Sequence, residues 1–157
     1  VGAMGDQISR HFLEKVILSE IEQAPDNPNL YSLLGNIYYN SKDWAGVQDA
    51  WEKSLALEPN NAQVLNNLAW HYATCEDETV QDPARALAMA KMAIRLERLP
   101  HVWDTLAESY YVNGMHREAV EAGRQALTLA GKKRTYYENQ LDKFSNAAGN
   151  LKLKIED

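Results

Sequence analysis

Several residue types and segments are scarce in this chain of 157 residues, and each scarcity excludes a class of protein. The single cysteine, Cys75, excludes an intramolecular disulfide. No apolar run reaches the roughly 20 residues of a transmembrane helix, and no signal peptide is visible. The five prolines and eight glycines lie mostly between periodic segments, which is typical of a nearly all-helical protein.

The net charge of the chain makes some classes of binding partner improbable. A net charge of −6 and a pI near 5.2 argue against nucleic acid or an anionic membrane as the main partner. The one basic cluster, at 132–134, is interpreted as the cationic end of a helix that faces the helix dipole. With 45% hydrophobic and 24% charged residues, the chain has the composition of an ordinary globular domain.

Apolar periodicity predicts eight helices and a short tail. From Gly149 onward the chain has nothing obvious to pack on, so residues 149–157 are expected to fray. Residues 1–5 (Val-Gly-Ala-Met-Gly) are typical of a cloning remnant. The expected helices cover residues 7–23, 28–40, 43–57, 62–75, 82–97, 100–113, 116–130 and 134–147.

Three pairs of these helices form an internal repeat. Leu34 and Leu68 occupy equivalent positions 34 residues apart, the period of a helix–turn–helix unit. Such a unit cannot bury its apolar face alone, so copies stack into a solenoid whose end faces need capping. The expected organisation is an N-terminal helix in 6–27, repeats at 28–61, 62–99 and 100–131, and a capping helix in 132–148.

The second repeat carries an insertion. Tyr38 and Val47 are nine residues apart in the first repeat, but the equivalent Tyr72 and Ala86 are fourteen apart. The additional residues lie in an acidic turn at 76–81. Insertions in solenoids map to one face, often a functional one, and a tolerated surface loop is the alternative interpretation.

The packing positions of the three units resemble tetratricopeptide repeats over residues 28–131. Val47 and Ser54 replace the family's usual Ala, and Gly123 stands where a large residue is expected. The resemblance implies an all-α, right-handed solenoid that binds a protein or peptide in its concave groove, as an adaptor or scaffold without a cofactor. The matching sets are Tyr31/Leu34/Gly35/Tyr38, Leu65/Leu68/Ala69/Tyr72 and Trp103/Leu106/Ala107/Tyr110.

The segment 65–70, followed later by the segment 104–108, is similar to bacterial members of the family, so a bacterial origin is expected. The sequence does not decide between cytoplasm and periplasm. If residues 1–5 are a cloning remnant, a targeting segment or membrane anchor could have been removed when the remnant was introduced. Direct membrane insertion of this segment is not expected.

The resemblance also indicates groove residues, which lie on the first helix of each repeat. Trp70 has two interpretations, an aromatic anchor for a ligand and a space-filler between helices. Asp104 and Glu108 suggest a ligand with a basic or neutral segment. The expected groove residues are Asn36, Tyr39, Asn66, Asn67, Trp70, His101, Asp104, Glu108 and Tyr111.

One known activity of the family is not expected here. Members that bind the acidic C-termini of heat-shock chaperones hold two carboxylates with Lys, Asn and Arg side chains. Asn36 and Asn67 match the two Asn positions, but Ser32, His101 and Thr105 stand where the bases belong. Without permanent cations, a buried dicarboxylate would be poorly paired.

The sequence gives no sign of an enzyme. His71 and Cys75 are four residues apart on one helix, but they lack the four-ligand spacing of a structural zinc site, so no metal is expected. Nucleophile elbows and phosphate-binding glycine loops are missing as well. The alternative to groove binding is self-assembly into a homo-oligomer through the terminal helices, of which the first is either a cap or half of a repeat.

Overall fold

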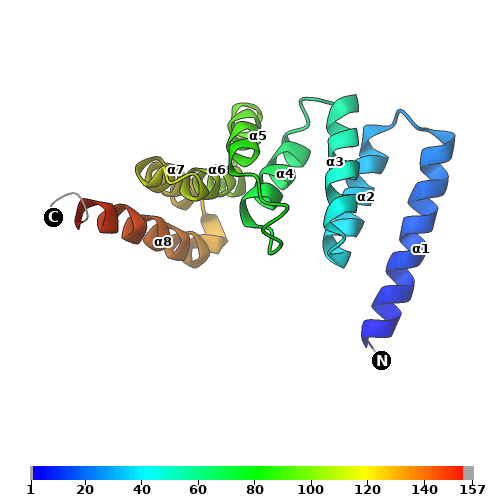
Figure 1. Ribbon diagram of the computed structural model, residues 1–157, viewed down its shortest axis with the longest axis horizontal. Helices are drawn as coiled ribbons and strands as arrows, with labels where there is room; N and C mark the ends of the chain where they lie inside the picture. The colour runs from blue at the N-terminus through cyan, green and yellow to red at the C-terminus, as the bar shows by residue number, and fades with distance from the viewer. Residues whose placement is uncertain (1, 154–157) are drawn as a thin grey trace. The chain divides into compact units, whose positions relative to one another are not determined.

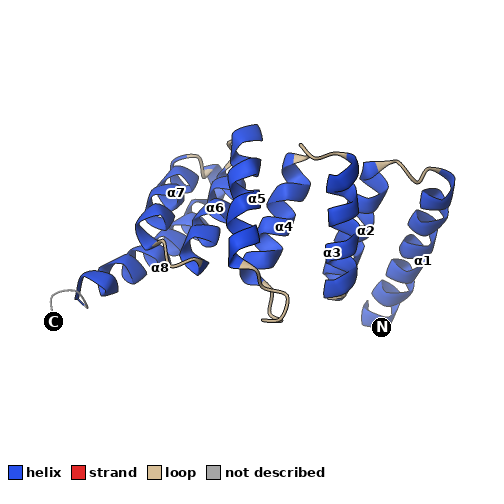
Figure 2. Cartoon of the chain, turned by 45° about the horizontal axis from the view of Figure 1, so that its top comes forward, coloured by secondary structure: helices blue, strands red, loops and turns tan. Residues whose placement is uncertain are grey.

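A computed structural model describes residues 2–153 of the chain, with side chains from residue 10 to residue 149. Within that range every regular element is a helix (Figures 1 and 2). Among the described helices, none is long and apolar enough to cross a membrane. The elements are α1 (Gly2–Gln23), α2 (Pro28–Ser41), α3 (Trp44–Leu57), α4 (Ala62–Thr74), α5 (Pro83–Leu96), α6 (Pro100–Val112), α7 (His116–Thr128), the 3-10 turn η1 (Gly131–Lys133) and α8 (Arg134–Leu153).

The predicted helices from 28 to 130 match these bounds within two residues, and the two terminal helices differ more. α1 begins at Gly2, so it takes in most of the expected cloning remnant. α8 continues to Leu153, although the sequence predicted its end near residue 147 and a frayed tail from Gly149. The last part of that tail, residues 154–157, lies outside the described residues.

The chain divides into two compact units, one ending at Val64 and the other beginning at Leu65. In the first unit, α2 and α3 pack around Trp51, which is 2% exposed. Its indole Nε1 donates to the Ser32 carbonyl oxygen at 3.2 Å. A Cβ placed on Gly35 would overlap the Trp51 ring, so only glycine allows this close approach of the two helices.

Two hydrogen bonds explain why particular residues occur at the start of α2 and on α3 in the first unit. Asn27 caps α2 by accepting from the Asn29 amide at 3.1 Å, and Pro28 follows as the first helical residue. Ser54, which replaces the alanine usual in tetratricopeptide repeats, is fully buried and donates its hydroxyl proton to the Pro28 carbonyl oxygen at 2.9 Å. The buried hydroxyl is therefore satisfied, and it ties α3 to the start of α2.

The second unit has a core built largely from small side chains. Alanines at 69, 90, 107, 119 and 122 pack with Leu106 and Phe144, all nearly or fully inaccessible. Phe144 comes from α8, and its ring lies 3.1 Å from where a Cβ of Gly123 would stand. This contact explains the small residue on α7 where the repeat pattern leads one to expect a large one: α8 supplies the missing volume.

The acidic turn between α4 and α5 is held by local hydrogen bonds (Figure 2). Asp77 Oδ1 accepts from the Thr79 amide at 3.0 Å and from its hydroxyl at 2.7 Å. Gln81 donates to the Cys75 carbonyl oxygen at 2.8 Å. Asp82 then caps α5 through the Arg85 amide, as the Asp-Pro pair predicts. The inserted residues therefore form a loop whose conformation is stabilised by its own hydrogen bonds.

Candidate functional site

On α2, the predicted groove residue Tyr39 is presented to solvent in a fixed position. Its ring is 36% exposed. It stacks on Trp51 with centroids 5.7 Å apart and meets Trp44 edge-on at 5.8 Å. Asn36, one turn earlier on the same helix, is half-buried. Because Trp51 is itself locked in the α2–α3 interface, Tyr39 is a large aromatic surface that loses little freedom on binding.

On α4, the predicted residues differ in accessibility. Trp70 and Asn67 are half-buried, whereas Asn66 is 8% exposed. The Asn66 side-chain oxygen accepts no hydrogen bond from the described part of the chain. His71 and Tyr72, which follow Trp70, are each 1% exposed. Trp70 is thus the one member of this aromatic run that is not fully buried.

On α6, the structure places two predicted groove residues under the C-terminal helix. Asp104 and Glu108 are each 4% exposed. Tyr136 donates its hydroxyl proton to Asp104 Oδ2 at 2.8 Å, and Gln140 donates to Oδ1 at 3.4 Å. Both Glu108 oxygens accept from Lys143 Nζ at 2.7 Å.

The interpretation of Asp104 and Glu108 as open ligand contacts needs correction. The place expected for a basic or neutral ligand segment is taken by α8 of the same chain, which covers both carboxylates. The physical reason is the cost of leaving carboxylates buried without donors, which α8 removes by supplying a lysine, a tyrosine and a glutamine.

Two further residues on α6 complete the predicted set. His101 at the start of the helix is exposed. Tyr111 is half-buried, with Lys143 Nζ over its ring at 4.5 Å and the Phe144 ring 5.7 Å away. The α8 contacts thus extend over two turns of α6 and include Tyr111.

Burial shifts several pKa values in this second unit. Burial raises the pKa of Asp104, and the hydrogen bonds from Tyr136 and Gln140 partly offset the effect. The pKa of Tyr136 is raised by burial first and then by the Asp104 carboxylate. Burial also lowers the pKa of His71 and raises that of Cys75. Buried in this way, His71 is favoured in its neutral form, and Cys75 is favoured as a thiol.

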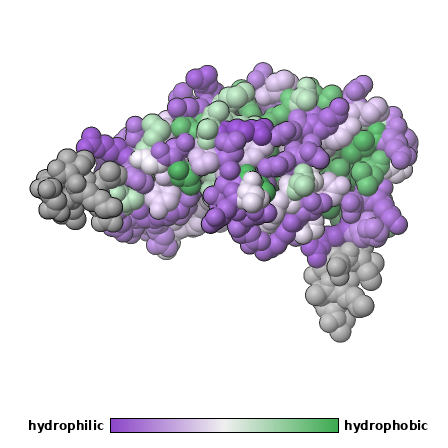
Figure 3. All heavy atoms as spheres, viewed as in Figure 1, coloured by the Kyte–Doolittle hydropathy of each residue, from purple (hydrophilic) through white to green (hydrophobic). Residues whose placement is uncertain are grey.

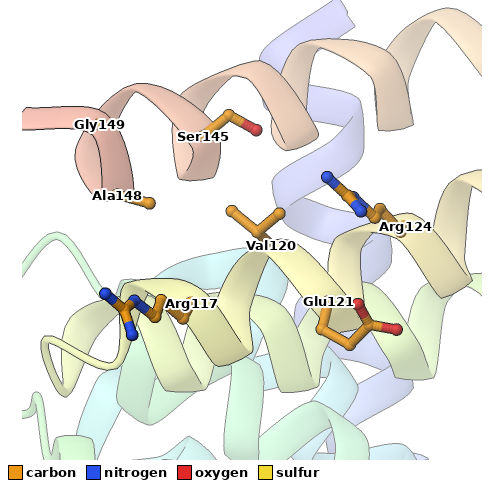
Figure 4. Close-up of a pocket in the computed structure, with 7 residues that line it drawn as sticks. All are labelled: Arg117, Val120, Glu121, Arg124, Ser145, Ala148 and Gly149. Carbon is orange, nitrogen blue, oxygen red and sulfur yellow. The ribbon is translucent and has the colours of Figure 1, made fainter. Parts of the chain in front are cut away.

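No cluster of three or more His, Cys, Asp or Glu side chains suited to a metal ion occurs among residues 10–149. A hollow of about 530 Å³ lies between α7 and the later part of α8. In Figure 4, Arg117 and Arg124 flank it on α7, with Val120 between them and Ala148 opposite. The sequence analysis missed this hollow, because it depends on how two helices separated by η1 diverge.

Comparisons with known proteins agree with this architecture. The profile of the tetratricopeptide repeat family matches residues 28–61. A pentatricopeptide repeat-containing mitochondrial protein of Arabidopsis thaliana is 27% identical over 139 residues, which cover 82% of this chain and 22% of that protein. The chain therefore spans about a fifth of the length of this relative.

The fold is similar to that of a crystal structure of PilW, described as a widely conserved type IV pilus biogenesis factor. The TM-score is 0.64 at 16% identity, over 89% of this chain and 79% of PilW. At that identity the likeness concerns the fold alone. Together, the repeat period, the packing around Gly35 and the family match identify residues 28–61 as a tetratricopeptide repeat.

Proposed function

We propose that the chain is a non-enzymatic adaptor that binds a peptide or protein segment on the first helices of its repeats. Tyr39 on α2 and Trp70 on α4 are its aromatic anchors, and Asn36, Asn67 and His101 are polar contacts. The observation that carries the proposal is Tyr39, an exposed ring held between two tryptophans. Rigid aromatic residues of this kind dominate the binding energy of many protein interfaces.

The amide residues add a second line of support. Asn36 and Asn67 are half-buried on first helices, where Asn36 follows the buried Gly35 and Asn67 precedes the buried Leu68. An amide side chain can both donate to and accept from a peptide backbone. Within each unit, a ligand would pair its main chain with the amide while an apolar side chain covers the aromatic ring. The pairs are Asn36 with Tyr39 in the first unit and Asn67 with Trp70 in the second.

The α8 contacts limit where such a ligand binds. Since Asp104 and Glu108 already hold Tyr136 and Lys143, the proposal excludes them from ligand contact. It also removes the reason to expect a basic or neutral ligand segment next to these two carboxylates. Ligand selection is then governed by aromatic and amide contacts, and a ligand without a basic segment should bind equally well.

The test is a peptide selected from a random display library on the intact chain, with its affinity then measured by isothermal titration calorimetry. Tyr39→Ala and Trp70→Ala should each weaken binding at least about tenfold, since loss of a hot-spot aromatic costs about 2 kcal/mol or more. Met92→Ala is the matched control, because Met92 is a 43% exposed apolar residue on the second helix α5.

Two outcomes would contradict the proposal. Unchanged affinity in both aromatic variants would remove the first-helix faces from the binding surface. Loss of binding in Arg117→Ala and Arg124→Ala instead would move it to the hollow between α7 and α8 (Figure 4). Circular dichroism of each variant confirms that the helices are retained.

A further inference from the structure

A short basic segment joins α7 to α8 and takes no part in the proposed groove. Lys132 and Lys133 lie in the 3-10 turn η1, and Arg134 is the first residue of α8. Residues 129–136 contain no acidic side chain, although the chain as a whole has a net charge of −6. The segment is therefore a local concentration of positive charge.

The structure corrects the interpretation of this cluster as the cationic end of a helix. α7 ends at Thr128, so Lys132 lies beyond the last turn, over which the negative end of the α7 dipole acts. The cluster stands instead at the start of α8, where the helix dipole is positive and cations are unfavourable. The fold therefore gains no stability from these charges through the dipole of α8.

The two lysines also lack a partner within the described part of the chain. Arg134 Nε pairs with Glu138 Oε1 at 3.0 Å. Lys132 and Lys133 are exposed, and among residues 10–149 they make neither an ion pair nor a side-chain hydrogen bond. Because these two charges stand at a helix start and meet no carboxylate of the chain, they are available to the carboxylates of another molecule.

Two large side chains flank the basic turn and add contact area. Leu129 precedes η1 and is 47% exposed, and Tyr136 follows it and is 45% exposed. The Tyr136 ring is held in place, because its hydroxyl donates to Asp104 and its ring meets Tyr137 edge-on at 5.0 Å. In the space-filling view, hydrophilic surface predominates over α8, with small hydrophobic areas within it (Figure 3). We call Leu129, Lys132, Lys133 and Tyr136 the η1 surface.

The chemistry of the η1 surface favours a protein segment over an anionic membrane or a nucleic acid. Membrane binding needs apolar side chains that enter the bilayer, but the Tyr136 hydroxyl is tied to Asp104. A nucleic acid is held by a series of phosphate contacts, whereas two unpaired lysines are present here on a chain of negative net charge. Two ammonium groups that lie in sequence between two large side chains match a segment with carboxylates beside apolar residues.

We propose that the η1 surface binds an acidic segment of a partner protein, whose carboxylates pair with Lys132 and Lys133 and whose apolar side chains cover Leu129 and Tyr136. The contact is small, so its dissociation constant is expected in the micromolar range or above, and binding should weaken as the salt concentration rises. The site goes beyond the proposed groove, because none of its four residues lies on α2, α4 or α6.

The probe for this site is a fluorescein-labelled peptide of sequence Glu-Glu-Leu-Phe-Glu-Glu, and fluorescence anisotropy with the intact chain measures its affinity. The double variant Lys132→Glu/Lys133→Glu should bind the peptide at least about tenfold more weakly. Lys15→Glu/Lys53→Glu is the matched control, because both of these lysines are exposed, lie on α1 and α3, and alter the net charge by the same amount. The control should bind the peptide like the parent.

Three further measurements test the individual contacts. Leu129→Ala should weaken binding about threefold, since it removes apolar contact area and leaves the charges in place. A peptide with lysine in place of each glutamate should bind the double variant and not the parent. In a ¹H–¹⁵N NMR spectrum, the acidic peptide should shift the indole signal of Trp103, which packs beside Ala130 and Tyr137.

Several results would overturn the proposal. The parent may not fail to bind the acidic peptide at low salt, and the double variant and its matched control must not weaken binding equally, because that would show attraction to overall charge alone. Binding to vesicles of equal parts phosphatidylcholine and phosphatidylserine, without peptide binding, would replace the protein partner by lipid. Self-association that the double variant abolishes would replace it by a second copy. The library-selected groove peptide should bind the double variant as tightly as the parent, which keeps the two proposals separately testable.

Discussion

Substitution of Gly35 by alanine is the sharpest test of how the first repeat packs. In an exposed helix the same change stabilises a protein by about 0.5–1 kcal/mol, because glycine loses more backbone freedom on folding. At Gly35 the added Cβ would come within 2.8 Å of Trp51 Cγ and closer still to Cδ1. Trp51 is 2% exposed and held by its bond to the Ser32 carbonyl oxygen, so the ring has no free space to enter.

The magnitude follows from three effects. Overpacking a core costs about 1–3 kcal/mol, and displacing the indole from Ser32 costs about 1 kcal/mol more. The gain in helix propensity offsets about 1 kcal/mol of this. Gly35→Ala should therefore lower the free energy of unfolding by about 1–3 kcal/mol.

Urea denaturation followed by circular dichroism measures this change, with two other glycines as references. Gly149→Ala meets nothing within 4 Å and should be neutral or slightly stabilising, whereas Gly123→Ala approaches the Phe144 ring at 3.1 Å and should fall between the two. In a Trp51→Leu background, Gly35→Ala should lose its penalty. A stable Gly35→Ala in the parent background would refute the packing described for α2 and α3.

Three other consequences can be measured. Burial raises the pKa of Asp104, so the folded chain binds the carboxyl proton more tightly than the unfolded chain does. The stability that this proton contributes at low pH is lost as pH rises through the folded pKa. Asp104→Asn should remove this loss of stability, measured by urea denaturation at a series of pH values from about 4 upward. Cys75 is 6% exposed with a raised pKa, so a thiol reagent should label it much more slowly in the folded chain than in urea, and equal rates would contradict its burial. Lys42 adopts a left-handed φ of 61° at the turn position where the third repeat has Gly114 with φ 72°, so Lys42→Gly should stabilise by about 0.5–1 kcal/mol in thermal denaturation, and a loss of stability would show that the Lys42 side chain is needed.

The sequence predicted the helices between 28 and 130 well because the repeat supplies the same information three times. Spacing of Leu34, Leu68 and Leu106 fixes the register, and Asn27 and Asp82 mark helix starts by a mechanism that acts within three residues. The ends were harder to predict. The end of α8 carries no proline or capping glycine signal strong enough to stop a helix before Leu153.

The candidate site was harder to predict than the fold, because it depends on contacts between distant residues. Asp104 and Glu108 look like open groove carboxylates until α8 is placed, since Tyr136 and Lys143 are 32 and 35 residues away. A signal was present: Tyr136, Gln140 and Lys143 recur at helical spacing as donors. To assign these three donors to Asp104 and Glu108, one has to know that their side of α8 packs against α6 instead of facing solvent.

The exceptions to the repeat pattern also have tertiary causes. Ser54 is explained by the Pro28 carbonyl oxygen on α2, and Gly123 by the Phe144 ring on α8. Neither partner is adjacent in sequence, so composition and spacing reveal the departure but not its reason.

The most direct test of the proposed adaptor function uses the four tryptophans as reporters. Their indole N–H groups give separate signals in a ¹H–¹⁵N NMR spectrum, which can be followed as the library-selected peptide is added. The account predicts that the Trp70 signal shifts, together with Trp44 or Trp51 beside Tyr39, while Trp103 at the α8 contact stays in place. Saturable binding that moves Trp103 alone, or none of the four signals, would contradict it.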